Sequence, residues 1–375
     1  MIGSALPANA DSPMLRRLVL PLITIPLAAP ASADIRIAVI APLTGQFQTL
    51  GKQVRDGVQK AVADLNAKGG IGGETVVLDV EDDACKAENA AAAANRAAGR
   101  GDVLVIGHVC YEAAQAAASV YAQSGIVLIS PAVSADSFTD RRAGPSIFRL
   151  AAADRAQGLV AGSFLARRYA KARIAILDDG SPYAQPIAEG VRKSLSDAGI
   201  REARRDNFDG GAKDYDDLAG RLIDDAIDVV FVGGYQADIA AILKSLRAAK
   251  SAMVVMGPDS IATTQFTDLA GDRADGTLFT FFTDWRRVPG AAKAIADFRA
   301  SGIEPVGFVL PAYAGVEIWA SARASASDNA AIAAHIQKDT FQTVLGNVAF
   351  SDYGSAQIPA FSIFRWQDGN VVQVE

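Results

Sequence analysis

Short apolar runs separated by segments of helical spacing dominate residues 35–130. Each run is bounded by glycine, proline or polar residues, which is typical of buried strands. The predicted strands cover residues 35–41, 75–81, 103–106 and 126–129. Helices are predicted between them, from the near-helical spacing of Val54, Val58, Val62 and Leu65 and from alanine-rich residues 87–98 and 112–123. Strand, helix and strand in such close succession predict parallel strands in one sheet.

The same alternation restarts after residues 148–154, which we interpret as a crossing segment. Strands are predicted at residues 173–177, 228–232, 253–256 and 277–282, and helices at 158–169, 185–198, 215–223 and 238–249. Further helices at 291–300, 310–324 and 330–345 precede a hairpin, 361–366 and 370–374, with Asp368-Gly369 as its turn. Two series of the same kind predict two similar doubly wound α/β lobes joined by three crossing segments, near Ala151, Phe282 and Gln357. Lobe 1 would comprise residues 34–151 and 283–357, and lobe 2 residues 152–282 and 358–375.

Residues 1–33 have the three parts of a secretory signal peptide. Arg16 and Arg17 precede the apolar run 18–29, and Ala31-Ser32-Ala33 is an A-x-A cleavage signal. The run is too short for a permanent membrane span, and a membrane anchor or a disordered tail is the alternative. We therefore expect a periplasmic mature chain that begins at Asp34, with either Met1 or Met14 as the first residue of the precursor.

Composition narrows the class of function. A hydrophobic fraction of 50% and a charged fraction of 21% are globular values, and a net charge of −6 argues against nucleic acid or an anionic membrane as partner. After residue 33 no apolar run is long enough to insert into a membrane. The sequence contains no G-x-S-x-G, H-E-x-x-H or P-loop pattern, and the glycines at 69–73 follow a helix, the reverse of the dinucleotide fingerprint. We predict no cofactor.

Cys85 and Cys110 are the two cysteines of the chain. Each follows a predicted strand of the same lobe, and an oxidising compartment permits a disulfide between them. A free thiol and a metal site are the alternatives. With His108 and His335 as the only histidines, a Cys/His zinc site is disfavoured, and we predict no metal.

The loops at residues 107–112 and 130–135 follow two strands predicted to be parallel. In such sheets the helix N-termini after the strands present free N–H groups to ligands. These two loops are therefore predicted to form one half of a small-molecule site.

Several motifs together resemble the periplasmic leucine/isoleucine/valine-binding proteins. They are IRIAVIAPLTGQFQTLG, DLNAKGGIGG, EDDAC, VIGHVC, GIVLISPAVS, VFVGGY and VMGPDS, in order over residues 34–375. The resemblance implies a type I periplasmic-binding fold without enzymatic activity. It also implies two lobes that close over an amino acid, branched-chain or otherwise aliphatic, and deliver it to the permease of an ABC importer.

The resemblance also implies a set of ligand contacts. The backbone of Tyr111 would meet the ligand's carboxylate, and Ala132, through its backbone, and Ser134 would contact the α-carboxylate and ammonium. From lobe 2, Tyr183, Tyr235 and Asp259 would complete the site, with Asp259 facing the ammonium. Leu50 would contact the ligand side chain, and Cys85 and Cys110 would form the disulfide of the family.

Three of these residues differ from the family pattern: Tyr111 replaces a serine, Asp259 a glutamate and Leu50 an aromatic residue. An amide, urea or an aromatic acid is therefore an alternative ligand. Taken singly, Asp259 also fits a turn and Ser134 a helix cap, and Tyr183 and Tyr235 fit exposed loops. The two rival functions are an exported enzyme, which needs a nucleophile or metal cluster, and the ectodomain of a signalling receptor, which needs a membrane-spanning segment.

Overall fold

The structure is a computed structural model that describes residues 1–5, 34–45 and 47–374. Contacts divide the chain into residues 1–33 and residues 34–375, and all the elements below belong to the second unit. The predicted charged, apolar and cleavage parts of the signal peptide lie outside the described residues.

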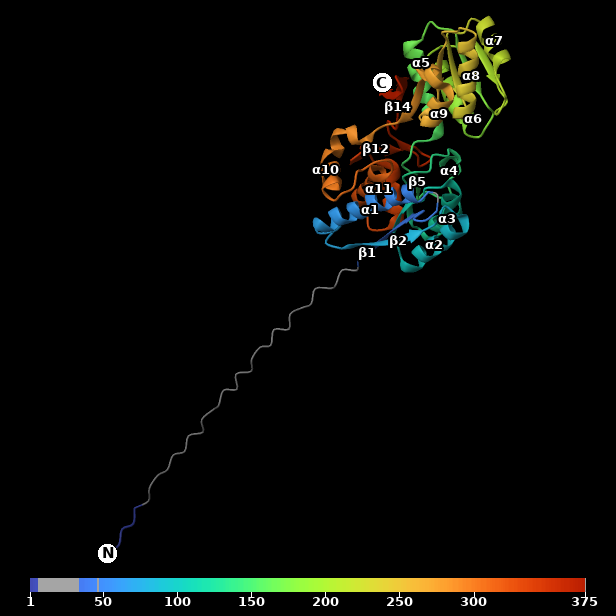
Figure 1. The fold of residues 1–375 in the computed structure, drawn as a ribbon. Helices are drawn as coiled ribbons and strands as arrows, with labels where there is room; N and C mark the ends of the chain where they lie inside the picture. Colours follow the sequence, from blue (N-terminus) through green and yellow to red (C-terminus); the bar gives the residue numbers. More distant parts are fainter. Residues whose placement is uncertain (6–33, 46, 375) are drawn as a thin grey trace. The chain divides into compact units, whose positions relative to one another are not determined.

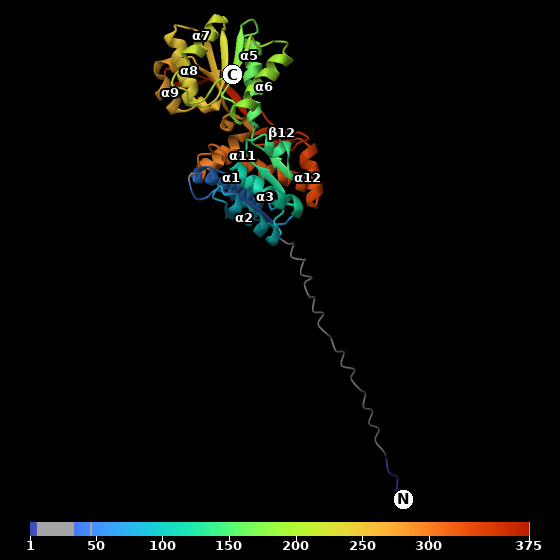
Figure 2. The same ribbon diagram turned by 90° about the vertical axis from the view of Figure 1, so that its right-hand side faces the viewer.

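The first sheet has five parallel strands in the order β2-β1-β3-β4-β5. Figures 1 and 2 show this part of the chain in blue to green. Its strands are β1 (Ile35–Ala41), β2 (Val76–Asp82), β3 (Leu104–Gly107), β4 (Val127–Ser130) and β5 (Ile147–Arg149). The helices between them are α1 (Gln48–Ala67), α2 (Ala87–Arg100), α3 (Tyr111–Ser124) and the short α4 (Ser137–Asp140). This order is doubly wound, which confirms the predicted class.

Alternate residues of the first sheet face two separate cores. Ile37 and Val39 belong to one buried cluster and Ala38 and Ile40 to the other, because successive strand residues point to opposite faces. Helices α2 and α3 supply the alanines of the second cluster, and small side chains let these helices lie close to the sheet. The other face is covered by α1 and by helices from the last third of the chain.

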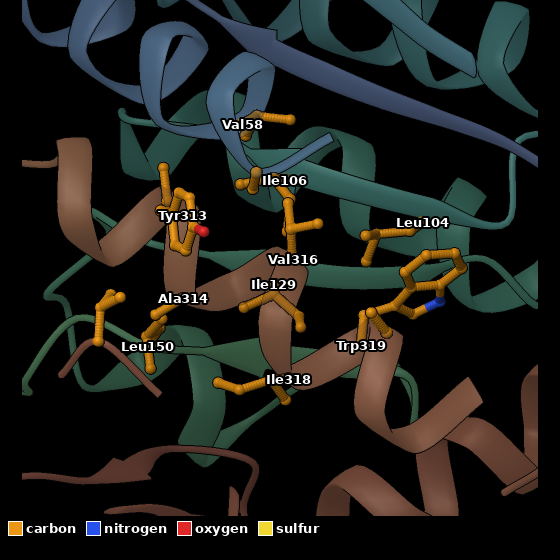
Figure 3. Packing of buried hydrophobic residues seen from close by; sticks show 14 of the residues in the cluster. Val58, Leu104, Ile106, Ile129, Leu150, Tyr313, Ala314, Val316, Ile318 and Trp319 are labelled. Carbon is orange, nitrogen blue, oxygen red and sulfur yellow. The ribbon is translucent and has the colours of Figure 1, made fainter. Parts of the chain in front are cut away.

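Those late helices are α10 (Ala292–Ala300), α11 (Val309–Arg323) and α12 (Asn329–Lys338). Figure 1 shows α11 beside α1, although the two are far apart in sequence. Figure 3 shows Val316 of α11 directed at Ile106 and Ile129, with Trp319 beside Leu104. Trp319 is fully buried. The core on this face of the first sheet therefore contains residues from both the first and the last third of the chain.

The parallel part of the second sheet has the same strand connectivity as the first sheet. Its order is β7-β6-β8-β9-β10-β14-β15, so its five parallel strands follow the same winding as the first sheet. They are β6 (Ile174–Asp178), β7 (Arg204–Asn207), β8 (Val229–Gly233), β9 (Val254–Gly257) and β10 (Leu278–Phe282). The predicted C-terminal hairpin, β14 (Phe361–Gln367) and β15 (Asn370–Gln373), adds antiparallel strands at the edge. Its helices are α5 (Asp154–Arg168), α6 (Ala184–Asp197), α7 (Asp216–Asp224), α8 (Gln236–Ala248) and α9 (Thr264–Ala270).

The chain passes between the two cores three times. Buried residues up to Leu150 and from Ala291 to Phe350 pack on the first sheet, whereas those from Ala161 to Phe279 and then Ile363 and Trp366 pack on the second. The exact lobe bounds given above stay a prediction. Short 3₁₀ helices occur at η1 (Asp259–Ile261), η2 (Gly271–Ala274), η3 (Trp285–Arg287) and η4 (Pro289–Ala291).

Three details differ from the sequence prediction. The last predicted helix ends at Lys338, because residues 341–343 form strand β11 (Phe341–Thr343) of a small sheet with β12 (Gly346–Phe350) and β13 (Ala356–Gln357). The start of the expected crossing segment is strand β5, which pairs with β4. Strand β7, with the sequence RRDN, was not predicted.

Candidate functional site

Asp82, at the end of β2, connects the loop after β1 to the loop after β2. Its Oδ1 accepts hydrogen bonds from the backbone N–H of Leu43 and of Ala84, both at 2.8 Å, and its Oδ2 accepts one from Thr44 Oγ1 at 2.5 Å. Burial works against the charged form, but the hydrogen bonds from Thr44, Ala84 and Leu43 hold the pKa of Asp82 below its usual value.

Asp83 extends this network into the loop after β3. It is fully buried, accepts a hydrogen bond from the Cys85 N–H at 2.9 Å, and lies 2.6 Å from Nδ1 of the buried His108. Nε2 of His108 lies 2.9 Å from the Tyr121 hydroxyl. The disulfide between Cys85 and Cys110, which confirms the predicted pairing, covalently joins the same two loops.

Ser130 carries the network to the fourth loop. Its Oγ donates to the His108 carbonyl at 3.0 Å and accepts from the Val133 N–H at 3.1 Å. The loops after β1, β2, β3 and β4 are thus cross-linked at the carboxyl end of the first sheet. This end is where doubly wound sheets hold their ligands.

Tyr111 and Ser134 lie in these loops but differ in their surroundings. Tyr111 is the first residue of α3, and its phenolic oxygen accepts a hydrogen bond from Ser137 Oγ at 3.1 Å. This contact holds the Tyr111 side chain against α4. Ala132 and Ser134 are half-buried, and the Ser134 carbonyl accepts a hydrogen bond from buried Arg149 Nη1 at 2.7 Å.

The second sheet brings Tyr183, Tyr235 and Asp259 together. Tyr183 donates its hydroxyl proton to Asp259 Oδ1 at 2.5 Å. The two tyrosine rings stack, with centroids 5.2 Å apart and planes 27° apart. Burial raises the pKa of Asp259, although hydrogen bonds from Tyr183 and Gln157 oppose the shift. Because burial disfavours the ionised form of Asp259, a cationic group placed beside this carboxylate would stabilise that form.

Asp154 and Gln157, in the first turn of α5, link the two sets of residues. Asp154 forms a side-chain hydrogen bond with Ser134, and its N–H donates to the Ser134 carbonyl at 3.2 Å. One helical turn later, Gln157 Oε1 accepts hydrogen bonds from the Asp259 N–H at 3.1 Å and from Thr280 Oγ1 at 2.9 Å. The sequence analysis did not predict Asp154 as a site residue. The feature that could have indicated it is an acidic residue at the start of the helix that follows a predicted crossing segment.

Burial raises the pKa of Asp154 to about 6. The Ser134 hydrogen bond lowers this pKa, the negative charges of Asp136 and Asp259 raise it, and Arg149 lowers it.

A cavity of about 490 Å³ lies against the segments that connect the two cores. Its walls include Leu50, Pro131, Phe281 and Phe308. Of the seven predicted ligand residues, Leu50 lines this cavity and the other six do not. The predicted set therefore divides into one residue at an apolar cavity, three residues on the second sheet, and three in the loops of the first.

A sequence model of the family described as "Periplasmic binding protein" matches residues 34–370. The chain belongs to this family. The Leu/Ile/Val-binding protein homolog 2 of Brucella abortus is 33% identical over 340 residues, which cover 90% of this chain and 91% of that protein. The Leucine-, isoleucine-, valine-, threonine-, and alanine-binding protein of Pseudomonas aeruginosa is 33% identical over 339 residues, with the same coverage of 90% and 91%.

Among solved structures, an ABC transporter substrate-binding protein from Desulfitobacterium hafniense in complex with Leu is similar with a TM-score of 0.72. The two chains are 22% identical, and the match covers 91% of this chain and 100% of the other. This likeness confirms the type I periplasmic-binding fold that the motifs predicted.

Within the described residues, no helix of this periplasmic binding protein is long and apolar enough to cross a membrane. In the same part of the chain, no group of three or more histidine, cysteine, aspartate or glutamate residues could hold a metal ion. The polar groups that the structure places around the candidate site include backbone N–H groups, hydroxyls and the carboxyls of Asp82, Asp83, Asp154 and Asp259.

Proposed function

We propose that this periplasmic binding protein is the receptor of an ABC importer and binds an α-amino acid with an apolar side chain. The two lobes, 34–151 with 283–357 and 152–282 with 358–375, close over the ligand and present it to the permease. The protein acts by binding and not by turnover. Cleavage after Ala33 places it in the periplasm, and an intact mass that starts at Asp34 would verify the processing.

The half-buried carboxyl of Asp259, whose pKa is raised by burial, is the observation that supports this function best. It accepts a hydrogen bond from Tyr183, whose ring stacks on Tyr235, at the carboxyl end of the second sheet, the end at which doubly wound sheets hold ligands. The ammonium of an amino acid would neutralise it and Asp154 at once. The N–H groups of Tyr111 and Ala132 supply donors for the α-carboxylate, which favours charge-assisted hydrogen bonds. The Ser134 hydroxyl, whose proton goes to Asp154, offers its oxygen to the ammonium.

The relatives named above support the same class of ligand. Their names refer to leucine, isoleucine and valine, in one case with threonine and alanine. We place the ligand side chain at Leu50, on the apolar cavity, and the two charged ends at the polar groups of the two sheets. In this arrangement the polar groups bind the charged ends of the ligand, and the apolar cavity determines which ligand side chains are accepted.

The substitution Asp259→Asn tests this function. Removing one partner of a desolvated charge pair costs about 2–5 kcal/mol, so the affinity for L-leucine measured by calorimetry should fall by at least about thirtyfold. Asp272→Asn, at an exposed residue of η2, is the matched control and should leave the affinity unchanged. Equal affinity of Asp259→Asn and the parent would contradict the ammonium contact and favour an amide, urea or an aromatic acid as ligand.

A further inference from the structure

Arg149, the last residue of β5, is a charged side chain in the interior of the protein, and 1% of the residue is exposed. Its Nη1 donates hydrogen bonds to the carbonyls of Ser134 and Ala135, both at 2.7 Å. On the other side of the guanidinium, Nη2 and Nε donate to Ser355 Oγ at 2.8 and 3.3 Å. The guanidinium therefore bridges two groups of acceptors, and all of these acceptors are uncharged.

The two groups of acceptors belong to parts of the chain that are far apart in sequence. Ser134 lies in the loop after β4, which the proposed function places against the charged ends of the ligand. Ser355 lies in the third stretch that connects the two cores, between Phe350 on the first sheet and Ile363 on the second. Arg149 thus cross-links a proposed ligand loop to a connecting stretch.

The backbone of Arg149 joins the same two parts of the chain. Its N–H donates to the Gly354 carbonyl at 2.8 Å, and Arg149 forms a parallel bridge with Ser355. On the other side, Arg149 pairs with Ser130, the residue directly before the loop after β4. The next residue, Leu150, donates its N–H to the Ser130 carbonyl at 2.8 Å. The first connecting stretch therefore begins at a residue whose backbone and side chain are both held.

The three connecting stretches pack against one another in a small apolar cluster. Ala152 belongs to the first stretch, Trp285 to the second, and Ala360 and Phe361 to the third. In a hinge motion a few residues of such connecting stretches absorb the change in backbone angles. Because Arg149 directly precedes the first stretch and is bonded to the third, it fixes the loop after β4 to one end of this hinge.

Arginine is suited to this role because its donors lie in a rigid plane and reach acceptors on two sides at once, whereas a lysine ammonium is a single point charge. Burial lowers the pKa of Arg149, and the negative charges of Asp136, Asp154 and Asp140 oppose this shift. An arginine remains charged in proteins even so. Its bonds to the loop and to Ser355 are therefore charge-assisted and stronger than those of a neutral donor.

We propose that Arg149 is a positioning residue for ligand binding, which anchors the loop after β4 to the third connecting stretch through Ser355. The guanidinium does not contact the ligand; it holds the groups of the loop that do. The effect on affinity rests on the proposed function, since L-leucine is the probe. The anchoring of the loop does not depend on the identity of the ligand.

Calorimetry with L-leucine, well below the melting temperature of each variant, tests the effect on binding. Ser355→Ala removes the acceptor on the connecting stretch and leaves the carbonyls of the loop in place, and the affinity should fall at least about threefold. Arg149→Lys cannot bridge both sides and should reduce the affinity at least about tenfold. In the Arg149→Lys background, Ser355→Ala should change the affinity less than about twofold, because the bond that it removes is already lost.

Arg142→Lys is the matched control. Arg142 donates to the Asp352 carbonyl at 2.9 Å, in the same turn that carries Ser355. None of its hydrogen bonds within the described residues reaches the loop after β4. Arg142→Lys therefore loosens the turn without releasing the loop, and the affinity for L-leucine should match that of the parent.

Amide hydrogen exchange of the unliganded proteins measures the order of the loop without any ligand. The N–H groups of residues 132–136 should exchange at least about fivefold faster in Ser355→Ala than in the parent, whereas those of α3 should keep their rates. This measurement supplies a readout that a role in overall stability alone would not change. It also uses the milder of the two substitutions, which removes one hydroxyl.

The outcomes separate this inference from the proposed function. Parental affinity in Arg149→Lys, or parental exchange of the loop in Ser355→Ala, would overturn the positioning role. A loss of affinity in Arg142→Lys equal to that in Ser355→Ala would also overturn it, because loosening of the turn would then explain both. If the parent bound no amino acid, the proposed function would be wrong, and the exchange rates of the loop would still decide for or against the anchoring.

Discussion

Asp154 destabilises the unliganded protein at neutral pH, and this effect can be measured. Its folded pKa is raised from 3.8 to about 6, with burial as the largest cause. Between these values the folded state binds more protons than the unfolded state, so the free energy of unfolding falls as the pH rises from about 4 to above 6. A shift of about two pKa units corresponds to about 3 kcal/mol, present in full at pH 8.

Asp154→Asn removes this destabilisation, because the amide stays neutral and its oxygen still accepts a hydrogen bond from Ser134. At pH 8 we expect the free energy of unfolding to rise by up to about 3 kcal/mol, and the melting temperature by about 4 °C for a domain pair of this length. At pH 4 the gain should shrink to about 0.5 kcal/mol, because the folded Asp154 is then already protonated.

Differential scanning calorimetry of the unliganded parent and Asp154→Asn at pH 4, 6 and 8 measures this dependence, with Asp272→Asn as the exposed control. The same variant should bind L-leucine more weakly, because it lacks one of the two carboxyls that we propose to face the ammonium. Higher stability with lower affinity is the expected signature of a binding residue. A gain that does not vary with pH, or a loss of stability at pH 8, would refute the assignment of this pKa to Asp154.

Two further predictions concern the framework of the first sheet. Replacing Cys85 and Cys110 by serine should lower the free energy of unfolding by about 3 kcal/mol, since the disulfide closes a loop of 25 residues; an unchanged urea midpoint would contradict this. Gly57→Ala should cost at least about 1–3 kcal/mol, because its Cβ would lie 2.2 Å from the Val309 carbonyl oxygen of α11. Gly99→Ala, in an open part of α2, should instead be neutral or stabilising by up to about 1 kcal/mol in the same denaturation experiment.

Much of the fold could be predicted because the parallel strands are buried on both faces. Such strands appear as continuous apolar runs, and β1 was predicted with its observed bounds, Ile35–Ala41. Strand β7 was not predicted because this edge strand, with the sequence RRDN, contains no apolar residue. Helix α12 was predicted too long because Phe341 continues its apolar spacing, whereas the chain there pairs with Val348.

The candidate site was less predictable, because its residues are brought together by tertiary contacts. The motif resemblance located Tyr183, Tyr235 and Asp259, which the structure joins in one cluster. Asp154 and Gln157 resemble ordinary residues of a first helical turn, and their contacts with Ser134 and Asp259 depend on how the crossing segment meets both sheets. The orientation of Tyr111 toward Ser137 also could not follow from the sequence.

The central claim is that this binding protein recognises the ammonium of an α-amino acid with the half-buried carboxyls of Asp154 and Asp259. Calorimetric titration of the parent with L-leucine and with isocaproate, the same molecule without its ammonium, tests it most directly. We predict one L-leucine bound per chain and an affinity for isocaproate at least about thirtyfold lower, the consequence of losing a desolvated charge pair. Equal or tighter binding of isocaproate would contradict the account.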